Sequence, residues 1–439
     1  MSLITQAIRG TQDFLPTDTH KLQHAEQTAL SIARDFGYNE IRTPVFEHTE
    51  LFHRSVGETT DVVQKEMYTF EDKSGRSITL RPEGTAGVAR AVLEHGMHNE
   101  RLPVKVSYIT TCYRYEKPQA GRYREFRQFG VECFGAAAPQ ADAEVIALAA
   151  SVLRELGVTS VSLHLNSIGC PDCRPQYHAA LKAYFDGNSD KLCGTCHGRL
   201  ERNPMRILDC KSPICSGIAQ NAPVMMDYLC DGCRTHFDAV RACLHAAEME
   251  YELDTGIVRG LDYYTRTVFE FMSDALGAQS VVCGGGRYDG LTEELGGPHL
   301  PSLGFGMGLE RLMMVMEASA AEIPRPERCE VYFASMGDTA VQKCFEMAVK
   351  LREGGVSVEC DVVGRGIKAQ MKYADKIGAR YAIVVGDNEL ETGIANLRDM
   401  ESGEQTEIAL DDSMYTTLYN KSLDRQLSGM ADLFGNMAE

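Results

Sequence analysis

The sequence has no long apolar run, no secretory leader and no internal repeat. No apolar stretch approaches the roughly 18–20 residues that a helix needs to cross a membrane. The chain begins Met-Ser-Leu-Ile-Thr, without the basic region and apolar core of a secretory signal. We therefore expect a cytoplasmic protein with no membrane partner, and a length of 439 residues predicts two or three domains with sizeable cores.

An excess of positive charge is also absent, because 44 Lys and Arg residues face 62 Asp and Glu residues and the formal net charge is −18. A simple nucleic-acid binder would be basic. Basic side chains do gather in two stretches, residues 112–128 and 364–380. An acidic body with local basic patches is typical of a protein that engages a partner at defined points, although a solvated surface has the same pattern.

The usual nucleotide-binding loops are missing as well. The glycine run Gly284–Gly286 lacks the G-x-x-x-x-G-K-[ST] spacing of a phosphate loop. It also lacks the strand–turn–helix context of a G-x-G-x-x-G dinucleotide site. This run alone therefore predicts no phosphate site.

Two alternating segments, residues 107–116 and 125–134, predict a pair of half-buried strands joined by a basic loop. A period of two places Arg114 and Glu116 on one face. On the return strand it places Gln128 and Glu132 on either side of Gly130, which would leave space for a small polar guest. The planar guanidinium of Arg114 suits a phosphate. The same residues could instead form a surface hairpin with ordinary ion pairs.

Fifteen cysteines in a chain expected in the cytoplasm predict metal sites or free thiols rather than disulfides. Eight of them lie in one segment, and their spacing suits two four-thiolate zinc sites. The sequence groups the first four as one site and, more loosely, the last four as another, while free thiols remain the alternative. In order, the eight are Cys170, Cys173, Cys193, Cys196, Cys210, Cys215, Cys230 and Cys233.

Beyond a proline-punctuated linker at 323–328, buried strands alternate with helices, which predicts a small α/β domain with a mixed sheet. Lys368, Lys372 and Lys376 are four residues apart, so they share one helical face, which on its own is more often a solvated surface. Nearer the N-terminus we expect a helix over 19–36 followed by a strand over 41–47 that contains Pro44.

Several of these stretches resemble the class II aminoacyl-tRNA synthetases. Arg114-x-Glu116, the basic loop and Phe126 resemble the second signature motif of that class, and the helix and proline-bearing strand resemble the first. The glycine-alternating segment 302–312 resembles the third motif, in which the glycines would let adenine lie flat. Residues 257–270 resemble a segment specific to histidyl-tRNA synthetases. With motifs in the expected order from Ile8 to about Asp412, the chain is similar to bacterial-type members of that family.

The resemblance implies an α+β catalytic core with a six-stranded antiparallel sheet and flanking helices, a cysteine-rich insertion and an α/β anticodon-binding domain. It also implies a homodimer. The expected boundaries are 1–168 and 249–322 for the two parts of the core, 169–248 for the insertion, which would approach the tRNA acceptor arm, 323–328 for the linker, 329–425 for the anticodon-binding domain and 426–439 for the tail.

The resemblance further implies ATP-dependent attachment of L-histidine to tRNA(His) through a histidyl-adenylate, with Mg²⁺ bound alongside ATP. Its catalytic cations would be Arg114, Arg259 and Arg311. ATP would also meet Glu116 and Phe126. Histidine would be held by Glu83, Thr85, Gln128, Glu132, Tyr263 and Tyr264, and tRNA by Arg122, Tyr123, Arg124, Lys368 and Lys372.

Some of these residues could have only structural roles. Thr85 could be a helix N-cap, and a tyrosine pair in a strand usually belongs to the hydrophobic core. A rival function is a non-catalytic, histidine-sensing regulatory paralogue of ATP phosphoribosyltransferase. Such a paralogue would be expected to lack the catalytic arginine and the C-terminal domain. A zinc-dependent nucleic-acid binder without enzymatic activity is a second rival.

Overall fold

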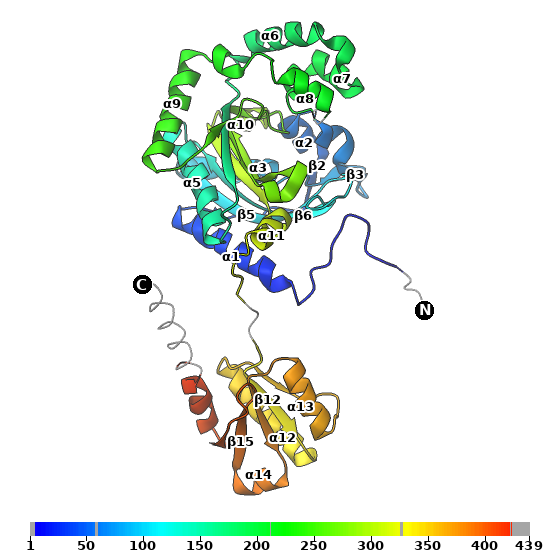
Figure 1. Cartoon of the computed structure of the whole chain (residues 1–439), viewed down its shortest axis with the longest axis vertical. Helices are drawn as coiled ribbons and strands as arrows, with labels where there is room; N and C mark the ends of the chain where they lie inside the picture. The colour runs from blue at the N-terminus through cyan, green and yellow to red at the C-terminus, as the bar shows by residue number, and fades with distance from the viewer. Residues whose placement is uncertain (1–4, 58–59, 211, 325–327, 422, 424–439) are drawn as a thin grey trace. The chain divides into compact units, whose positions relative to one another are not determined.

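The structure, a computed structural model, describes residues 5–57, 60–210, 212–324, 328–421 and 423. Its contacts divide the chain into two compact units, Met1–Pro324 and Arg325–Glu439 (Figure 1). Within the described residues, no helix combines the length and the apolar character that crossing a membrane requires. The predicted tail, 426–439, lies outside the described residues.

An eight-stranded sheet forms the centre of the first unit. Its six inner strands pair in antiparallel fashion, as predicted for the catalytic core. A two-residue strand is added in parallel at each edge, which the sequence did not predict. In spatial order the strands are β1 (Asn39–Glu40), β5 (Val104–Tyr113), β6 (Glu125–Phe134), β11 (Ser302–Gly308), β10 (Val281–Arg287), β9 (Thr265–Met272), β7 (Ser162–Ser167) and β8 (Glu252–Leu253).

Strand alternation gives the two faces of this sheet different roles. Phe129, Val131 and Cys133 of β6 are buried in a core with four helices: α1 (Thr19–Asp35), α5 (Pro139–Glu155), α9 (Asp231–Ala246) and α11 (Leu309–Ala318). The intervening positions, including Gln128 and Glu132, point to the opposite face. That face is where α3 (Thr85–Glu94) packs, through Val88 and Val92, in a second core.

A smaller sheet, in the order β2 (Phe46–His48), β4 (Ser77–Leu80) and β3 (Tyr68–Glu71), lies beside α2 (Thr49–Val56). The predicted strand over 41–47 is wrong for residues 41–45, and only 46 and 47 belong to a strand, β2. Pro44 has no N–H to donate to a ladder. The carbonyl oxygens of Thr43 and Pro44 instead accept hydrogen bonds from Arg81, at 2.9 and 3.0 Å.

The cysteine-rich segment is built from short helices at the opposite end of the first unit from α1 (Figure 1). They are α6 (Arg174–Asp186), α7 (Gly194–Arg202), α8 (Pro213–Ala219) and the first turns of α9, with short 3₁₀ turns at Ser189–Lys191, Pro204–Ile207 and Met225–Tyr228. Their apolar side chains, such as Tyr177 and Leu200, share the second core with α3 and β5. The segment thus packs onto the catalytic sheet.

The second unit is a five-stranded mixed sheet, as predicted. Three strands are parallel, β13 (Val358–Cys360), β12 (Val331–Ser335) and β14 (Tyr381–Val385). An antiparallel pair, β15 (Ile394–Asp399) and β16 (Gln405–Ala409), extends the sheet and was not predicted from its acidic sequence. Its helices include α12 (Asp338–Glu353), α13 (Ile367–Lys376) and the short α14 (Asp387–Thr392), and residues 413–421 are also helical.

Candidate active site

One cavity of about 580 Å³ in the first unit gathers eight of the predicted site residues. The β5–β6 connection and β6 supply most of them, the loop between β8 and β9 supplies one, and α11 supplies another. The eight are Arg114, Glu116, Arg122, Tyr123, Phe126, Gln128, Arg259 and Arg311. Residues that are more than 180 positions apart in the sequence therefore line the same cavity.

Backbone carbonyl oxygens fix the positions of the arginine side chains in this cavity. Arg114 donates through Nε to the Pro82 carbonyl oxygen at 2.7 Å. Arg311 donates to the carbonyl oxygens of Gly121 and Val281, at 2.9 and 2.8 Å. Burial, together with repulsion from Arg122 and Arg114, lowers the pKa of Arg311. Arg114 and Arg122 share the carboxylate of Glu116, whereas Arg311 forms no ion pair within the described residues, so its guanidinium suits a polyanionic ligand.

Arg259 has an unusual backbone conformation, and its side chain is held by two neighbours. Its φ is +55°, a left-handed conformation that non-glycine residues rarely adopt and that functional sites often contain. Its guanidinium pairs with Glu270 and lies 5.4 Å from the centre of the Tyr264 ring. A Cβ at Gly284 would stand 2.4 Å from its Nη1, so the glycine run Gly284–Gly286 makes room for this arginine.

Arg259 keeps its positive charge although most of its side chain is buried. Burial acts to lower its pKa, but the Glu270 carboxylate and the Tyr264 hydroxyl outweigh it and raise the pKa above the usual value. Its buried Nε has no hydrogen-bond partner within the described part of the chain. A fixed cation with an unused donor can serve a developing negative charge.

Around Phe126, the cavity contains one cation–aromatic contact and one ion pair. Arg114 lies 5.4 Å from the centre of the Phe126 ring, and Arg122 forms an ion pair with the Glu116 carboxylate. Arg122 and Tyr123, predicted to meet tRNA, thus line the cavity itself. Arg124 does not line it, because its guanidinium stacks 3.9 Å from the Tyr115 ring centre.

Five of the six predicted histidine-binding residues form a buried cluster that does not line this cavity: Glu83, Thr85, Glu132, Tyr263 and Tyr264. Gln128 is the sixth. It lines the cavity, and its side-chain oxygen accepts a hydrogen bond from the Gly84 N–H at 3.2 Å. It is therefore the link between the cavity and the cluster.

Glu132 is the centre of the buried cluster. It is fully buried, and one carboxylate oxygen accepts hydrogen bonds from Thr85 at 2.7 Å and Tyr108 at 2.9 Å. The other accepts from the Tyr288 hydroxyl. Burial raises the pKa of Glu132 to about 8, against the lowering effect of the Tyr288 and Thr85 hydroxyls. Tyr108 and Tyr288 were not predicted as site residues, although each lies in a segment that the sequence had singled out.

The N-terminus of α3 corrects one expectation. Thr85 is not an N-cap, because its hydroxyl donates to Glu132. The N–H groups of Thr85 and Ala86 instead donate to the Glu83 carboxylate, at 2.6 and 2.9 Å. Glu83 thereby satisfies the first turn of the helix, and its burial raises its pKa. The two residues are thus linked to each other and to Glu132.

The glycines near this cluster also differ from expectation. Gly130 offers no room for a guest, because a Cβ there would stand 2.3 Å from the Tyr108 ring. A Cβ at Gly304 would stand 2.1 Å from the Glu132 carboxylate, and one at Gly306 would stand 2.2 Å from the Gln128 amide. Only Gly308 of the three β11 glycines faces open space. The glycine alternation in β11 therefore makes room for side chains of β6 at Gly304 and Gly306, while Gly306 and Gly308 line the cavity.

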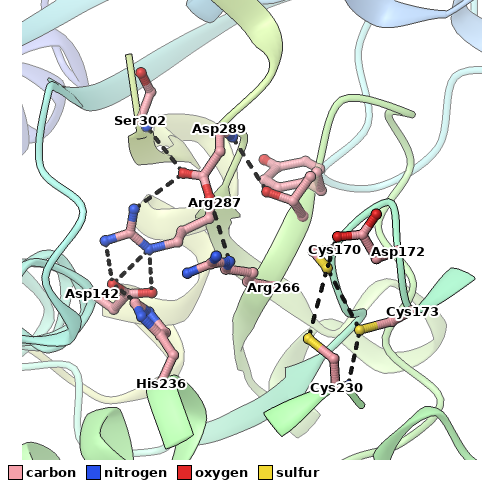
Figure 2. Close-up of polar contacts among 12 residues, drawn as sticks. Asp142, Cys170, Asp172, Cys173, Cys230, His236, Arg266, Arg287, Asp289 and Ser302 are labelled. Carbon is pink, nitrogen blue, oxygen red and sulfur yellow. Dashed lines mark hydrogen bonds and ion pairs between the residues drawn. The ribbon is translucent and has the colours of Figure 1, made fainter. Parts of the chain in front are cut away.

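A buried ion-pair network holds the strand end next to Tyr288 (Figure 2). Arg287, whose side chain is 1% exposed, pairs with Asp142 at 2.6 Å and with Asp289 at 3.2 Å. His236 of α9 reaches the same Asp142 carboxylate at 3.3 Å. These charges satisfy one another, so their role is to fix the β10 end from which Tyr288 reaches Glu132.

The eight cysteines form two clusters, but with a different grouping from the predicted one. The first cluster is Cys170, Cys173, Cys230 and Cys233, and the second cluster is Cys193, Cys196, Cys210 and Cys215. Within each, the four sulfur atoms lie within 4.8 Å of one another. Figure 2 shows three sulfur atoms of the first cluster.

The reason for the regrouping is the path of the chain. Helix α6 carries the chain away from Cys173, and the chain returns only at the start of α9. There the sulfur atoms of Cys230 and Cys170 are 4.0 Å apart. The second pair, at the start of α7, instead meets Cys210, which is 3.9 Å from Cys193. Sequence proximity alone could not reveal this nesting.

Two predicted tRNA contacts lie in the second unit. Lys368 and Lys372 are exposed on α13, where their four-residue spacing places them on one face. Their role in tRNA binding stays a prediction.

Comparison with known proteins assigns the family. A family model described as "Histidyl-tRNA synthetase" matches residues 10–171 and 224–312, and one described as "Anticodon binding domain" matches 330–416. A curated protein named histidine–tRNA ligase from Acetivibrio thermocellus is 54% identical over 409 residues, covering 93% of this chain and 98% of the relative. Another with that name, from Caldanaerobacter subterraneus subsp. tengcongensis, is 52% identical over 410 residues, covering 93% and 98%.

A solved structure agrees with these matches. The apo histidyl-tRNA synthetase of S. aureus is 37% identical, with a TM-score of 0.81, covering 94% of this chain and all of that one. The fold is thus a class II catalytic domain followed by an anticodon-binding domain. The chain belongs to the histidyl-tRNA synthetase family.

Proposed function

We propose that this enzyme attaches L-histidine to tRNA(His) with ATP, in two steps through a histidyl-adenylate. The observation that carries the proposal is the pairing of two adjacent environments. Three arginines from separate elements line one cavity, and Gln128 joins that cavity to a buried carboxylate cluster. The first environment suits a triphosphate, and the second suits a small side chain with two nitrogen atoms.

In the first step, the carboxylate of histidine attacks the α-phosphorus of ATP and pyrophosphate leaves. In the second, a ribose hydroxyl at the tRNA 3′ end takes the acyl group and AMP leaves. No side chain needs to act as a nucleophile, so catalysis comes from positioning and from cations that face the growing negative charge. Arg114, Arg259 and Arg311 provide three such cations, each in a fixed position.

Mg²⁺ bound with ATP would supply further positive charge. Carboxylates are the ligands that this ion prefers, and Glu270 and Glu310 both line the cavity. We assign Phe126 and Glu116 to the adenine, by stacking on its face and accepting from its amine.

For histidine we propose that Glu132 and Tyr264 meet the two imidazole nitrogens, with Glu83 and Thr85 near the ammonium and Gln128 and Tyr263 completing the pocket. Every one of these groups is buried or half-buried. A buried polar pocket rejects apolar rivals because its own groups would lose their partners, and discrimination of about 10⁴-fold follows.

The direct test is ATP–pyrophosphate exchange with and without histidine. We expect exchange that requires histidine and a fall of at least about 10²-fold in Arg259→Ala, because a buried charge at the reacting phosphate is lost. Arg154→Ala, which removes an exposed arginine of α5, is the matched control and should exchange like the wild type. Histidine binding without exchange in the wild type would contradict the proposal and favour the regulatory paralogue.

The family assignment also supports partners beyond the catalytic unit. We propose that Arg122 and Tyr123 meet the tRNA acceptor end, that Arg124 lies close by, and that Lys368 and Lys372 contact the anticodon arm. We propose a homodimer, supported by Phe46 and Phe70, whose side chains are 55% and 48% exposed on the β2–β4–β3 sheet. Such an enzyme would act in the cytoplasm, where its tRNA is used.

We further propose one structural zinc ion in each cysteine cluster. Four thiolates in close contact suit tetrahedral zinc. Backbone groups already face the sulfur atoms, because the Cys230 N–H donates to Cys173 and the Cys193 N–H donates to Cys215, both at 3.2 Å. Four cysteines leave no position for water, so the role is structural.

A further inference from the structure

The loop between β8 and β9, residues 254–264, carries Arg259, Tyr263 and Tyr264. The structure describes every residue of this loop, and it contains neither helix nor strand. Arg259 within it, and Arg266 just after it, both have left-handed backbones, with φ of +55° and +52°. Such conformations persist only where the surroundings hold them. The question is which contacts hold this loop.

The part of the loop just after Arg259 is held from the region between the two halves of the second cluster. Arg206 lies in the turn Pro204–Ile207, which follows α7 and precedes Cys210. Its guanidinium donates to the Gly260 carbonyl oxygen at 2.6 Å and to the Asp262 carboxylate at 3.3 Å. Arg199 of α7 in turn donates to the Arg206 carbonyl oxygen at 2.9 Å. A chain of contacts thus runs from the second cluster to the residue next to Arg259.

The end of the loop is held from the first cluster. Arg174 follows Cys173 directly, and its guanidinium donates to the Tyr264 carbonyl oxygen. The residues leading into this cluster also pair with the loop end, because the Ile168 N–H donates to the Arg266 carbonyl oxygen and the Arg266 N–H donates to that of Gly169, each at 2.8 Å. The residues beside the first cluster therefore contact the backbone of both Tyr264 and Arg266.

The two arginines lie beside short elements: Arg174 begins α6, and Arg206 lies in a four-residue turn. The neighbouring helices α7 and α8 have nine and seven residues, a length at which an isolated helix is marginal in water. Each cluster, in contrast, joins stretches that are distant in sequence, Cys173 with Cys230 in one case. A metal ion that binds such a cluster contributes its binding energy to the fold of the segment.

We propose that the two metal-bound clusters hold the active-site loop at two places after Arg259, through Arg206 near the second cluster and Arg174 next to the first. The inference rests on the zinc sites proposed above and extends them, because it gives the insertion a role in positioning Arg259 and the tyrosines before any tRNA is present. Arg174 and Arg206 are then positioning residues: they act through the loop.

The experiment compares four arginine variants of the full-length enzyme. Arg174→Ala and Arg206→Ala remove the two contacts with the loop, and Arg234→Ala and Arg202→Ala are the matched controls. Each control removes an arginine of the same segment that donates within the segment, to the carbonyl oxygens of Met226 and Gly198 respectively. Three quantities are measured for each: zinc per chain by mass spectrometry, hydrogen exchange of the peptide covering 254–266, and the KM for histidine in ATP–pyrophosphate exchange.

We expect two zinc ions per chain in all four variants. Arg174→Ala and Arg206→Ala should lose protection in the loop peptide and raise the KM for histidine about tenfold, since small displacements of positioning groups are costly. The control variants should match the wild type. Cys230→Ser and Cys215→Ser should each lose one zinc ion and reproduce the effect of Arg174→Ala and Arg206→Ala, respectively.

Two results would overturn this role of the clusters. If the wild type binds no metal, or its cysteines form disulfides, the clusters cannot brace the loop through metal. If zinc is bound but Arg174→Ala and Arg206→Ala leave loop protection and the KM for histidine unchanged, the zinc sites stand and their role in holding the loop is wrong. Because wild-type exchange is measured alongside, failure of the proposed activity would be seen separately.

Discussion

The arginine cavity and the Glu132 cluster lie along the same face of β6, yet they treat charge in opposite ways. In the cavity, Arg114 and Arg311 remain charged beside each other, held by carbonyl oxygens. In the cluster, three hydroxyls surround one carboxylate whose pKa is raised to about 8. The contrast teaches that one strand can present a site for a polyanion and a site for a small uncharged ring within a few residues.

Removing a cavity cation should have the largest effect and should leave the cluster intact. Arg311→Ala is expected to lower the rate of histidine-dependent exchange by about 10²- to 10³-fold, because a preorganised charge at the transition state is lost. Arg311→Lys should recover only part of the rate, since an ammonium cannot reach both carbonyl oxygens that the guanidinium does. Equal exchange in Arg311→Ala and the wild type would show that this cation does not face the phosphates.

Gly304 and Gly308 of β11 differ in how closely they are packed, and Gly304 is the one that lies against the Glu132 cluster. Gly304→Ala places a Cβ 2.1 Å from the Glu132 carboxylate and 2.2 Å from the Val131 carbonyl oxygen, so we expect the free energy of unfolding to fall by about 3 kcal/mol. Gly308→Ala meets open space and should leave unfolding nearly unchanged. Urea denaturation of both variants measures the difference, and equal losses would mean that the cluster is not tightly packed around Glu132.

The charge state of Glu132 gives a smaller, pH-dependent effect. Its pKa is about 8 in the folded protein against a usual value of 4.5, so its contribution to stability is fully present below pH 4.5. That contribution is lost as pH rises towards 8, because the unfolded chain releases the proton first, with a slope of at most about 1.4 kcal/mol per pH unit. Glu132→Gln cannot titrate and should lack this slope in denaturation curves between pH 5 and 8. Parallel pH profiles for the two proteins would mean that Glu132 is ionised throughout.

Much of this site could be predicted from local patterns. Alternation identified β5 and β6 because one face of β6 packs on helices and the other faces the site. The cavity residues followed from motifs in which Arg114, Phe126 and Arg311 have characteristic spacings. Chemistry that depends on residue type and short-range order was therefore within reach of the sequence.

What was missed depends on how distant segments meet. Tyr108 and Tyr288 reach Glu132 only because of the register between strands, which no single segment specifies. The predicted strand over 41–47 was wrong at 41–45, where the Arg81 guanidinium donates to the carbonyl oxygens of Thr43 and Pro44. The cysteine grouping likewise depends on where α6 and α9 carry the chain.

The division of roles between cavity and cluster is tested most directly by steady-state ATP–pyrophosphate exchange on Arg259→Ala and Glu132→Gln, with histidine and ATP varied. The account predicts that Arg259→Ala lowers kcat at saturating histidine, because its cation serves the reacting phosphate. It predicts that Glu132→Gln mainly raises the KM for histidine, because it alters recognition of the imidazole. If Glu132→Gln left the KM for histidine unchanged, or if Arg259→Ala kept the wild-type kcat, the account would be contradicted.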